Sequence, residues 1–460
     1  MENRKAVIVV LVAVISIVAY NWSSGVITPE EQGALVVLIV GASLWTTEAI
    51  PLVATSIMIP LLQSLLGVQS FKDALSPFFD PVVMLLLGGF LLAISVDKQG
   101  LDQYFAYQII SKLKADARIV VLVFMMTTGF LSMWISNTAS TALMVTMAIR
   151  LTNQIKDSKG NFSKIMILGI AYSATAGGLS TLVGTTTCAM AAGFLKEMIG
   201  YEITFLEWMA YGLPITLVMI LVTWVVLFAI FPTDVKEIPN LELEIGPLDN
   251  KQKLTLTVFA LSILLWLTSK LPEPIALAIG WEGHGISSSA VAAIIGVAVL
   301  VLGLIHERDV AQAKWNTLLL IGGGLSLGSA LGVSGLVVRI SEYLVMLTGG
   351  RSGVLIIALV TVFGLGISIV ASNTASAGVF LPIAIGLGST TGVNPVILAV
   401  AVGISTSLDF MLPVGTPPNA IAYSTGKVEI KEMIKAGVLL DLSGAIITIL
   451  LAWLLWPHII

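Results

Sequence analysis

Charged residues are scarce in this sequence. Asp, Glu, Lys and Arg make up 11% of its 460 residues, whereas a soluble domain carries about 25%. Because so few charges cannot cover a water-exposed surface, most of the surface must face lipid. The mean hydropathy is +1.00, and apolar runs long enough to cross about 30 Å of hydrocarbon recur along nearly the whole chain. The sequence therefore predicts one all-α, polytopic membrane domain over residues 1–460.

Cysteine and histidine are almost missing. The single cysteine, Cys188, excludes an internal disulfide and a cysteine metal cluster. The three histidines, His284, His306 and His458, are too scattered for a zinc site. An intramembrane hydrolase would need a Ser–His arrangement, an Asp pair or a histidine-rich metal site. No histidine lies in an apolar run, and we expect Asp409 to have no acidic partner within one, which argues against an enzyme. The absence of a basic tail argues against nucleic acid as a partner.

The apolar runs define a predicted topology. They cover residues 6–22, 34–50, 52–68, 81–96, 118–150, 164–196, 209–232, 253–270, 286–305, 315–338, 351–388, 395–424 and 434–457. Two of them, 118–150 and 351–388, are too long for one crossing, and each carries a polar Ser-Asn-Thr at its middle. Irregular backbone at membrane depth is tolerated only where protein or water covers it. We therefore interpret both runs as re-entrant helical hairpins, and eleven crossings remain.

The positions of Lys and Arg support this topology, because cytoplasmic loops carry an excess of them. With the N-terminus in the cytoplasm, the residues of this kind on the outer side, out of 23, are only Lys72, Lys196, Lys270, Arg339 and Arg351. The prediction is a protein of the bacterial or archaeal cytoplasmic (inner) membrane, with its N-terminus inside and its C-terminus outside. The acidic, proline-containing residues 233–252 form a cytoplasmic linker between two halves.

Three motifs occur twice in the same order. Residues 136–140 (Ser-Asn-Thr-Ala-Ser) recur at 372–376, a Gly-Gly pair at 88–89 recurs at 322–323, and Val-Gly-Thr at 183–185 recurs at 414–416. They indicate a duplication, with a first repeat over 81–232 and a second over 315–457. Five crossings separate the two hairpins, and since five is odd, the second copy is inverted. Inverted repeats with broken helices at the midplane are typical of secondary transporters.

The hairpin tips predict a binding site. A tip leaves backbone N–H and C=O groups without helical partners, at several kcal/mol each in hydrocarbon. Ser, Thr and Asn side chains supply donors and acceptors, and helix N-termini favour anions. Two facing tips are predicted to hold the ends of a small dianion, with carbonyls and hydroxyls holding a hard cation such as sodium. Small polar residues also pack between helices, but their paired placement favours a site.

A second broken element stands at 413–419 (Pro-Val-Gly-Thr-Pro-Pro-Asn), where proline must interrupt the run 395–424. Its first-half counterpart at 184–188 lacks proline and follows a Gly-Gly pair. Asp409 lies inside the broken run, where cation binding, proton transfer, helix capping and a structural pairing are all open. Glu48 is expected to be structural. No positive side chain is expected within a span, so neutral donors, helix ends and bound cations should hold the anion.

These motifs, together with residues 45–51 (Trp-Thr-Thr-Glu-Ala-Ile-Pro), resemble the divalent anion/sodium symporter family, and within it the bacterial sodium–dicarboxylate symporters. The resemblance implies a homodimer with a scaffold domain and a transport domain that moves like an elevator. It implies substrate contacts from Ser136, Asn137, Thr138, Ser372, Asn373 and Thr374, near Thr185, Thr416 and Pro417. It implies one sodium site at Ser132, Ser136, Asn137 and the Gly184 backbone, and another at Ser368, Ala371, Asn373 and the Gly415 backbone.

Two positions depart from the family pattern. Residues 186–188 (Thr-Thr-Cys) stand where relatives often have Pro-Pro-Asn, and Asp409 stands where several relatives are apolar. The expected function is sodium-coupled import of C4-dicarboxylates such as succinate, malate and fumarate. The alternatives are sodium-independent dicarboxylate exchange and sodium-coupled transport of sulfate or citrate. A channel is a further alternative, but two closed tips suit alternating access better than a continuous pore.

Overall fold

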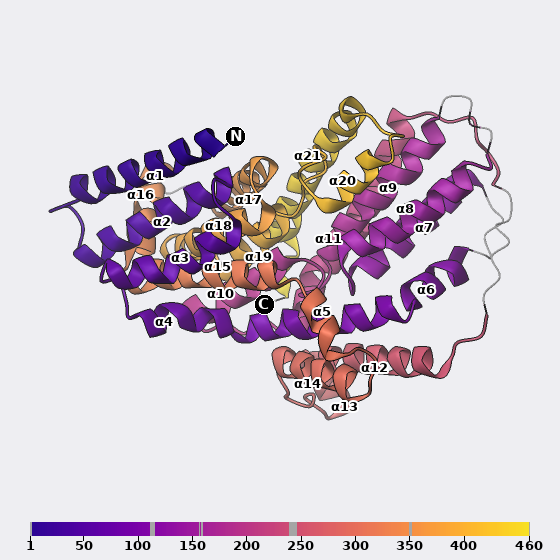
Figure 1. The fold of residues 1–460 in the computed structure, drawn as a ribbon, viewed down its shortest axis with the longest axis horizontal. Coiled ribbons are helices and arrows are strands. Elements are labelled where there is room, and N and C mark those ends of the chain that lie inside the picture. Colours follow the sequence, from indigo (N-terminus) through magenta and orange to yellow (C-terminus); the bar gives the residue numbers. More distant parts are fainter. Residues whose placement is uncertain are drawn as a thin grey trace.

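The computed structural model describes residues 2–110, 116–155, 157, 160–238, 246–348 and 352–459. Within these ranges the regular structure is helical, and the only β contacts are isolated bridges, Ser24–Ile27 and Asp116–Glu237. The predicted all-α class is confirmed (Figure 1). The centre of the predicted linker, residues 239–245, and Arg351 lie outside the described residues.

The chain forms the following helices in order. They are α1 (Glu2–Trp22), α2 (Pro29–Thr47), α3 (Leu52–Leu65), α4 (Phe71–Leu75), α5 (Pro81–Lys98), α6 (Leu101–Ile110), α7 (Ala117–Ser132), α8 (Asn137–Thr152), α9 (Asn161–Gly178), α10 (Thr186–Ile199), α11 (Phe205–Ile230), α12 (Asn250–Leu267), α13 (Glu273–Ile279), α14 (Ser288–Val301), α15 (Trp315–Val333), α16 (Leu336–Thr348), α17 (Gly353–Val370), α18 (Asn373–Thr391), α19 (Pro395–Ser405), α20 (Pro417–Ser424) and α21 (Ile430–Leu454). Short 3-10 turns cover Ser76–Phe79, Glu307–Gln312 and Trp456–His458.

Seven helical segments among the described residues are long and apolar enough to cross a membrane. They are Arg4–Trp22, Phe71–Lys98, Phe205–Ile230, Trp315–Val333, Gly353–Val370, Asn373–Thr391 and Ile430–His458. Apolar side chains of α1 are mostly exposed, for example Val10 at 61% and Ile17 at 62%. An apolar surface of this kind is stable only against lipid or another protein. The segments therefore support a membrane location.

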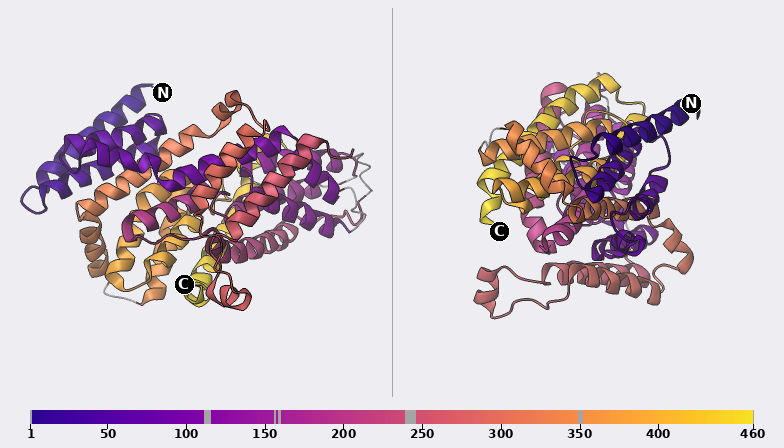
Figure 2. Two further views of the ribbon diagram at one scale, coloured as in Figure 1. Left: turned by 90° about the horizontal axis from the view of Figure 1, so that it is seen from below. Right: turned by 90° about the vertical axis from the view of Figure 1, so that its left-hand side faces the viewer.

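The helices form an elongated bundle. The N-terminal helices α1, α2 and α3 lie at one end of the long axis, and α7, α8 and α9 lie at the other (Figures 1 and 2). Helices α12 and α14 form a flank against α5. Helices α2, α3, α15 and α16 enclose a small core around Trp45, whereas most other buried residues belong to one large core.

Both over-long apolar runs are broken where the sequence predicts. Helix α7 ends at Ser132 and α8 starts at Asn137, while α17 ends at Val370 and α18 starts at Asn373. Helices α7 and α8 contact each other, and both pack against α9. The N–H of Ala117, the first residue of α7, donates to the Lys236 carbonyl at 2.8 Å, and Asn161, the first residue of α9, donates to the Pro232 carbonyl at 2.9 Å.

The outer ends of the second pair meet. A Cβ placed on Gly353, the first residue of α17, would lie 3.4 Å from a methyl group of Val393, just after α18. In the second pair, therefore, the Ser-Asn-Thr break forms the inner end of two helices whose outer ends adjoin, and in the first pair the break separates two helices that pack against each other.

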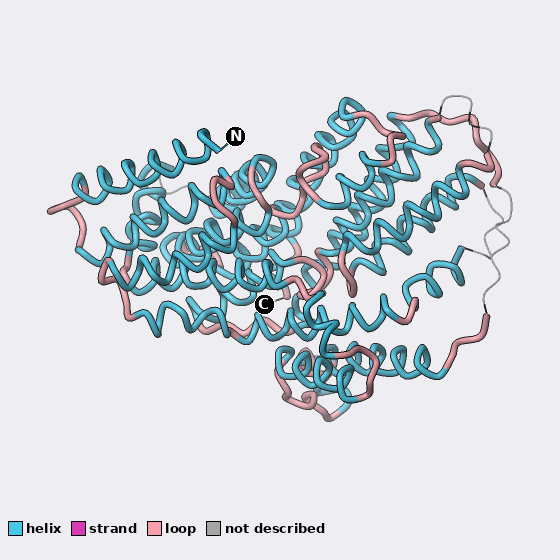
Figure 3. The backbone as a smooth tube through the Cα atoms, in the orientation of Figure 1, coloured by secondary structure: helices cyan, strands magenta, loops and turns pink. Residues whose placement is uncertain are grey.

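Two further helices are interrupted in the interior. Helix α9 stops at Gly178 and the chain resumes as α10 at Thr186, while α19 stops at Ser405 and the chain resumes as α20 at Pro417. The predicted break around residues 413–419 is thus present. Figure 3 shows these unwound segments as loops inside the bundle rather than at its ends. The interior loops place backbone groups where side chains would otherwise pack.

The paired glycines permit close helix packing. A Cβ on Gly88 would lie 2.1 Å from the Ala292 carbonyl oxygen of α14, and one on Gly323 would lie 2.6 Å from Ser56 Cβ of α3. Backbone atoms at such a distance cannot yield without moving a whole helix.

The substitution Gly88→Ala is expected to lower the thermal stability of the purified protein, because α5 and α14 must separate. The cost should be about 1–3 kcal/mol, as for an overpacked core. Gly332→Ala is the matched control, since nothing lies within 4 Å of a Cβ there and alanine favours the helix. Unfolding midpoints in detergent measure both effects, and a Gly88→Ala midpoint equal to that of the control would contradict the packing role.

Candidate functional site

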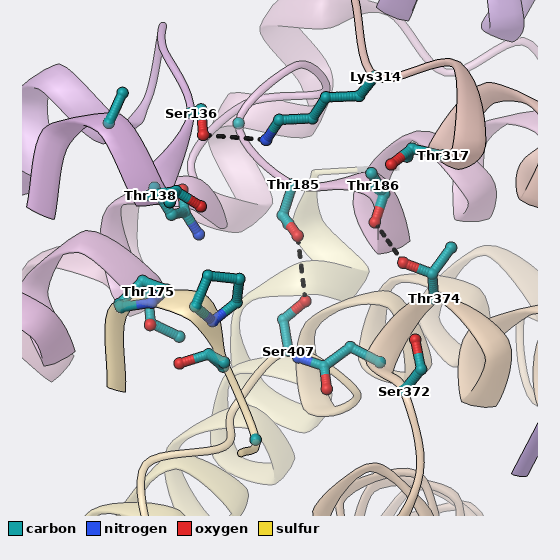
Figure 4. Close-up of a pocket in the computed structure, with 18 of the residues that line it drawn as sticks. Ser136, Thr138, Thr175, Thr185, Thr186, Lys314, Thr317, Ser372, Thr374 and Ser407 are labelled. Atoms are coloured by element: carbon teal, nitrogen blue, oxygen red, sulfur yellow. Dashed lines mark hydrogen bonds between the residues drawn. The ribbon is translucent and has the colours of Figure 1, made fainter. Parts of the chain in front are cut away.

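One cavity of about 940 Å³ lies at the inner ends of the broken helices. Its walls come from both Ser-Asn-Thr tips, both unwound segments, the end of α2 and the start of α15. The predicted site residues that line it are Ser136, Asn137, Thr138, Gly184, Thr185, Ala371, Ser372, Asn373, Thr374, Gly415, Thr416 and Pro417. Segments more than 200 residues apart in sequence thus meet around one space (Figure 4).

The remaining two predicted residues, Ser132 and Ser368, lie fully buried behind the tips. Ser132 Oγ is 2.5 Å from Asn137 Oδ1 and 2.7 Å from the Ala174 carbonyl oxygen. A hydroxyl group carries one proton, so it can donate to only one of these two oxygens. Three oxygens in close contact that share one proton form a site suited to a hard cation.

The second tip repeats this arrangement. Ser368 Oγ is 2.8 Å from Asn373 Oδ1 and 2.6 Å from the Thr406 carbonyl oxygen. The Ala174 carbonyl lies near the end of α9, and the Thr406 carbonyl belongs to the residue directly after α19, so each lies where an interrupted helix ends. The oxygen sets at the two tips therefore match in residue type and in geometry, and both have the chemistry that sodium requires.

Four helices begin at the cavity wall. These are α8, α10, α18 and α20, with Ser136, Thr185, Ser372 and Thr416 as their N-caps. Only the Thr416 side chain caps its own helix, by accepting from the Asn419 N–H at 3.3 Å. The first-turn N–H groups of the other three have no side-chain cap. Helix N-termini with free N–H groups attract anions, so the walls offer several such positions at once.

Threonine hydroxyls join the two halves of the chain across the cavity. Thr186 Oγ1 lies 2.8 Å from Thr374 Oγ1, and Thr185 Oγ1 lies 3.4 Å from Ser407 Oγ (Figure 4). Thr187 Oγ1 contacts Ser407 Oγ at 2.6 Å. The segment at 186–188, which departs from the family pattern, thus supplies hydroxyls that hold the first unwound segment against the second tip and the second unwound segment.

The side chain of Lys314 brings a positive charge to the cavity, and the sequence does not predict this. Lys314 precedes α15, and its Nζ donates to Ser136 Oγ at 2.9 Å (Figure 4). Although its side chain is accessible from the cavity, the surrounding protein desolvates the ammonium group and lowers the pKa of Lys314. The expectation that no positive side chain takes part at the site therefore misses this residue. The sequence feature that could have identified Lys314 is its position directly before the apolar run 315–338.

The surroundings of two acidic residues, Glu48 and Asp409, also differ from those that the sequence predicts. Glu48 lines the cavity, with a left-handed backbone at φ 47°, whereas the sequence suggests only a structural role. Asp409 does have an acidic partner in an apolar run: Asp441 of α21 interacts with it electrostatically. Asp441 Oδ1 accepts from the Phe410 N–H at 2.9 Å. The expectation of an isolated Asp409 is wrong, because it rests on chain proximity and α21 reaches Asp409 only in the fold.

Comparison with known proteins identifies the family. Residues 2–460 match the family model described as the sodium:sulfate symporter transmembrane region. The chain belongs to this symporter family. The predicted resemblance to divalent anion/sodium symporters is thereby confirmed, and the family consists of transporters rather than enzymes.

Relatives and solved structures agree with this assignment. The symporter is 34% identical over 449 residues to the sodium-dependent dicarboxylate transporter SdcS of Staphylococcus aureus (strain USA300), a match that covers 91% of this chain and 85% of SdcS. The fold is similar to that of the Alcanivorax borkumensis YdaH transporter, with a TM-score of 0.63, 13% identity, and coverage of 84% of this chain and 88% of that one. Neisseria gonorrhoeae MtrF aligns with a TM-score of 0.55 at 15% identity, over 85% of each chain.

Proposed function

We propose that this symporter imports C4-dicarboxylates such as succinate, malate and fumarate together with sodium ions. The observation that carries the proposal is the convergence in one cavity of helix N-termini suited to carboxylates and, directly behind them, two oxygen sets suited to sodium. The similarity to a sodium-dependent dicarboxylate transporter, SdcS, supports it.

Each of the two tips binds one end of the substrate. The N-termini of α8 and α18, with the side chains of Asn137, Thr138, Asn373 and Thr374, each bind one carboxylate. Two carboxylates repel each other at close range, so a small cavity needs positive charge nearby. Sodium ions behind the tips and the Lys314 ammonium provide that charge, and for this reason substrate binds well only after sodium.

The transport cycle follows from the paired tips. In this proposal the two helix pairs are re-entrant hairpins of an inverted repeat, with residues 81–232 and 315–457 as its halves. The chain then has eleven crossings, its N-terminus inside and its C-terminus outside. A transport domain carrying both tips moves like an elevator against a scaffold domain within a homodimer. Each sodium ion that enters with the membrane potential supplies about 2.3 kcal/mol per 100 mV.

Uptake of labelled succinate into proteoliposomes tests the function. We expect uptake that requires an inward sodium gradient and that unlabelled malate and fumarate inhibit. Uptake of equal rate without sodium, driven by succinate inside, would indicate exchange instead. Sodium-driven uptake of sulfate or citrate without succinate uptake would place the protein with carriers of those anions.

Asn137→Ala and Asn373→Ala are each expected to abolish sodium-dependent succinate uptake, because each removes an oxygen from one cation site and a donor from one tip. Rates should fall at least about 100-fold, the loss of several charge-assisted contacts. Thr146→Ala, an exposed change in α8 whose hydroxyl bonds only its own helix at 2.8 Å, is the control. Normal uptake by either asparagine variant, at equal protein density, would exclude that tip from the site.

Lys314→Gln is expected to raise the KM for succinate about tenfold at saturating sodium, with a smaller change in kcat, since it removes a charge that attracts the substrate. Lys314→Arg keeps the charge and should restore most of the affinity. Because the pKa of Lys314 is lowered, the wild-type KM should also rise with increasing pH at a lower pH than in Lys314→Arg. Initial rates over a range of succinate concentration and pH measure this, and an unchanged KM in Lys314→Gln would remove Lys314 from the site.

A further inference from the structure

Asp409 is a buried carboxyl group without a hydrogen-bonding partner. It is 0% exposed, and neither carboxylate oxygen contacts a donor within the described part of the chain. It takes part in none of the ion pairs found there, which join Lys98 to Asp309, Lys164 to Glu432, Lys196 to Glu202 and Arg339 to Glu31. A charge buried in this way is retained only where an opposite charge nearby compensates it.

The carboxylate lies directly against the second unwound segment. A Cβ on Gly415 would lie 2.0 Å from Asp409 Oδ2, so only glycine fits there. Gly415 itself lines the cavity beside Ala371 and Asn373. At the other end of the segment, the Thr406 carbonyl contacts Ser368 of the second cation site at 2.6 Å. Asp409 therefore stands between two backbone positions that adjoin that site.

The first half of the chain has a glycine at the same place. Gly178 stands six residues before Gly184, as Asp409 stands six residues before Gly415. The packing also corresponds, because a Cβ on Gly184 would lie 2.5 Å from the Gly178 carbonyl oxygen. Gly178 in turn has no room for a side chain, since a Cβ there would lie 2.6 Å from Asn137 Oδ1. The two oxygen sets thus match, but only the second has a carboxylate behind it.

Other groups around Asp409 do not cancel its charge. Asp441 is a second acidic residue nearby: its Oδ1 accepts from the N–H of Phe410, the residue after Asp409, and its Oδ2 has no partner among the described residues. Asn419 Nδ2 donates to the Asp409 backbone carbonyl at 3.1 Å rather than to the carboxylate. The Tyr172 hydroxyl is buried and also lacks a partner there. None of these neighbouring groups is a cation, so an ion beside the Gly415 backbone can supply the opposite charge that the Asp409 carboxylate lacks.

We propose that Asp409 makes the two sodium sites unequal: its carboxylate stabilises the ion at the second tip, which binds more tightly and fills before the ion at the first tip. The inference rests on the proposed function and adds an order of binding to it. Asp409 acts through its electric field at the Gly415 backbone. It is a positioning residue, and its action requires no direct contact with the substrate or the ion.

The isosteric substitution Asp409→Asn removes the charge and keeps the shape. In full-length protein in proteoliposomes, we expect the sodium concentration for half-maximal succinate uptake to rise at least about tenfold. The KM for succinate at saturating sodium should change by less than about twofold, a split that a general loss of structure would not produce. Asp102→Asn is the control, because Asp102 is a buried carboxyl of α6 that does not line the cavity, and its sodium curve should stay unchanged.

A folded Asp409→Asn protein with the wild-type sodium curve would overturn the inference, since it would show that the native group carries no charge that matters to sodium. If Asp409→Asn does not fold, the cation sites are compared directly by sodium-dependent thermal stabilisation without substrate. Ser368→Ala should then remove the high-affinity stabilisation, and its removal by Ser132→Ala instead would overturn the proposal. Wild-type uptake without any sodium dependence would refute the proposed function itself, which separates the two failures.

Discussion

Unpaired backbone at the interior ends of broken helices is the constraint on which this structure depends. Among the described residues, four helices begin inside the bundle, with Ser136, Thr185, Ser372 and Thr416 as their N-caps. In a membrane, such N–H and C=O groups cost several kcal/mol each when nothing binds them. The fold gathers them around a single cavity, so that the groups that would destabilise the protein most are also those that a ligand can satisfy.

The second constraint is the small number of charged residues near the cavity. Because they are few, each one contributes a large share of the electrostatic field there. Lys314 reaches the cavity, and Asp409 lies behind Gly415 in its wall, so the surroundings of the two matched oxygen sets differ. The two halves of the molecule are alike in backbone and hydroxyl geometry, and they differ in the charges behind them. A transporter that must take up ions and substrate in a fixed order needs such a difference.

Rigid packing holds these elements in register. Glycines at α5 and α15 let helices approach until backbone touches neighbouring atoms, and threonine hydroxyls bind the first unwound segment to the second tip and to the second unwound segment. The interior loops are therefore enclosed by closely packed helices, and a movement that exposes the cavity to the other side of the membrane would carry both tips together. This packing supports the proposed elevator movement.

The sequence by itself determined the helical class, the lipid-facing surface and the location of the helix breaks. These are local properties: apolar runs, a Ser-Asn-Thr in the middle of a run too long for one crossing, and prolines that remove a backbone donor. The duplicated motifs also pointed to residues that the fold brings to one cavity. Their roles in binding remain predictions, as do the repeat boundaries.

Only the tertiary structure decided which distant groups meet. Lys314 lies outside every span by composition, yet its long side chain extends to Ser136. Asp441 approaches Asp409 from a helix later in the chain, and Thr186 finds Thr374 across the interface of the two halves. Contacts between residues far apart in sequence depend on how helices pack, and a helix can present a residue to any of several neighbours. Their geometry, and with it the electrostatic difference between the two cation sites, is a property of the assembled bundle.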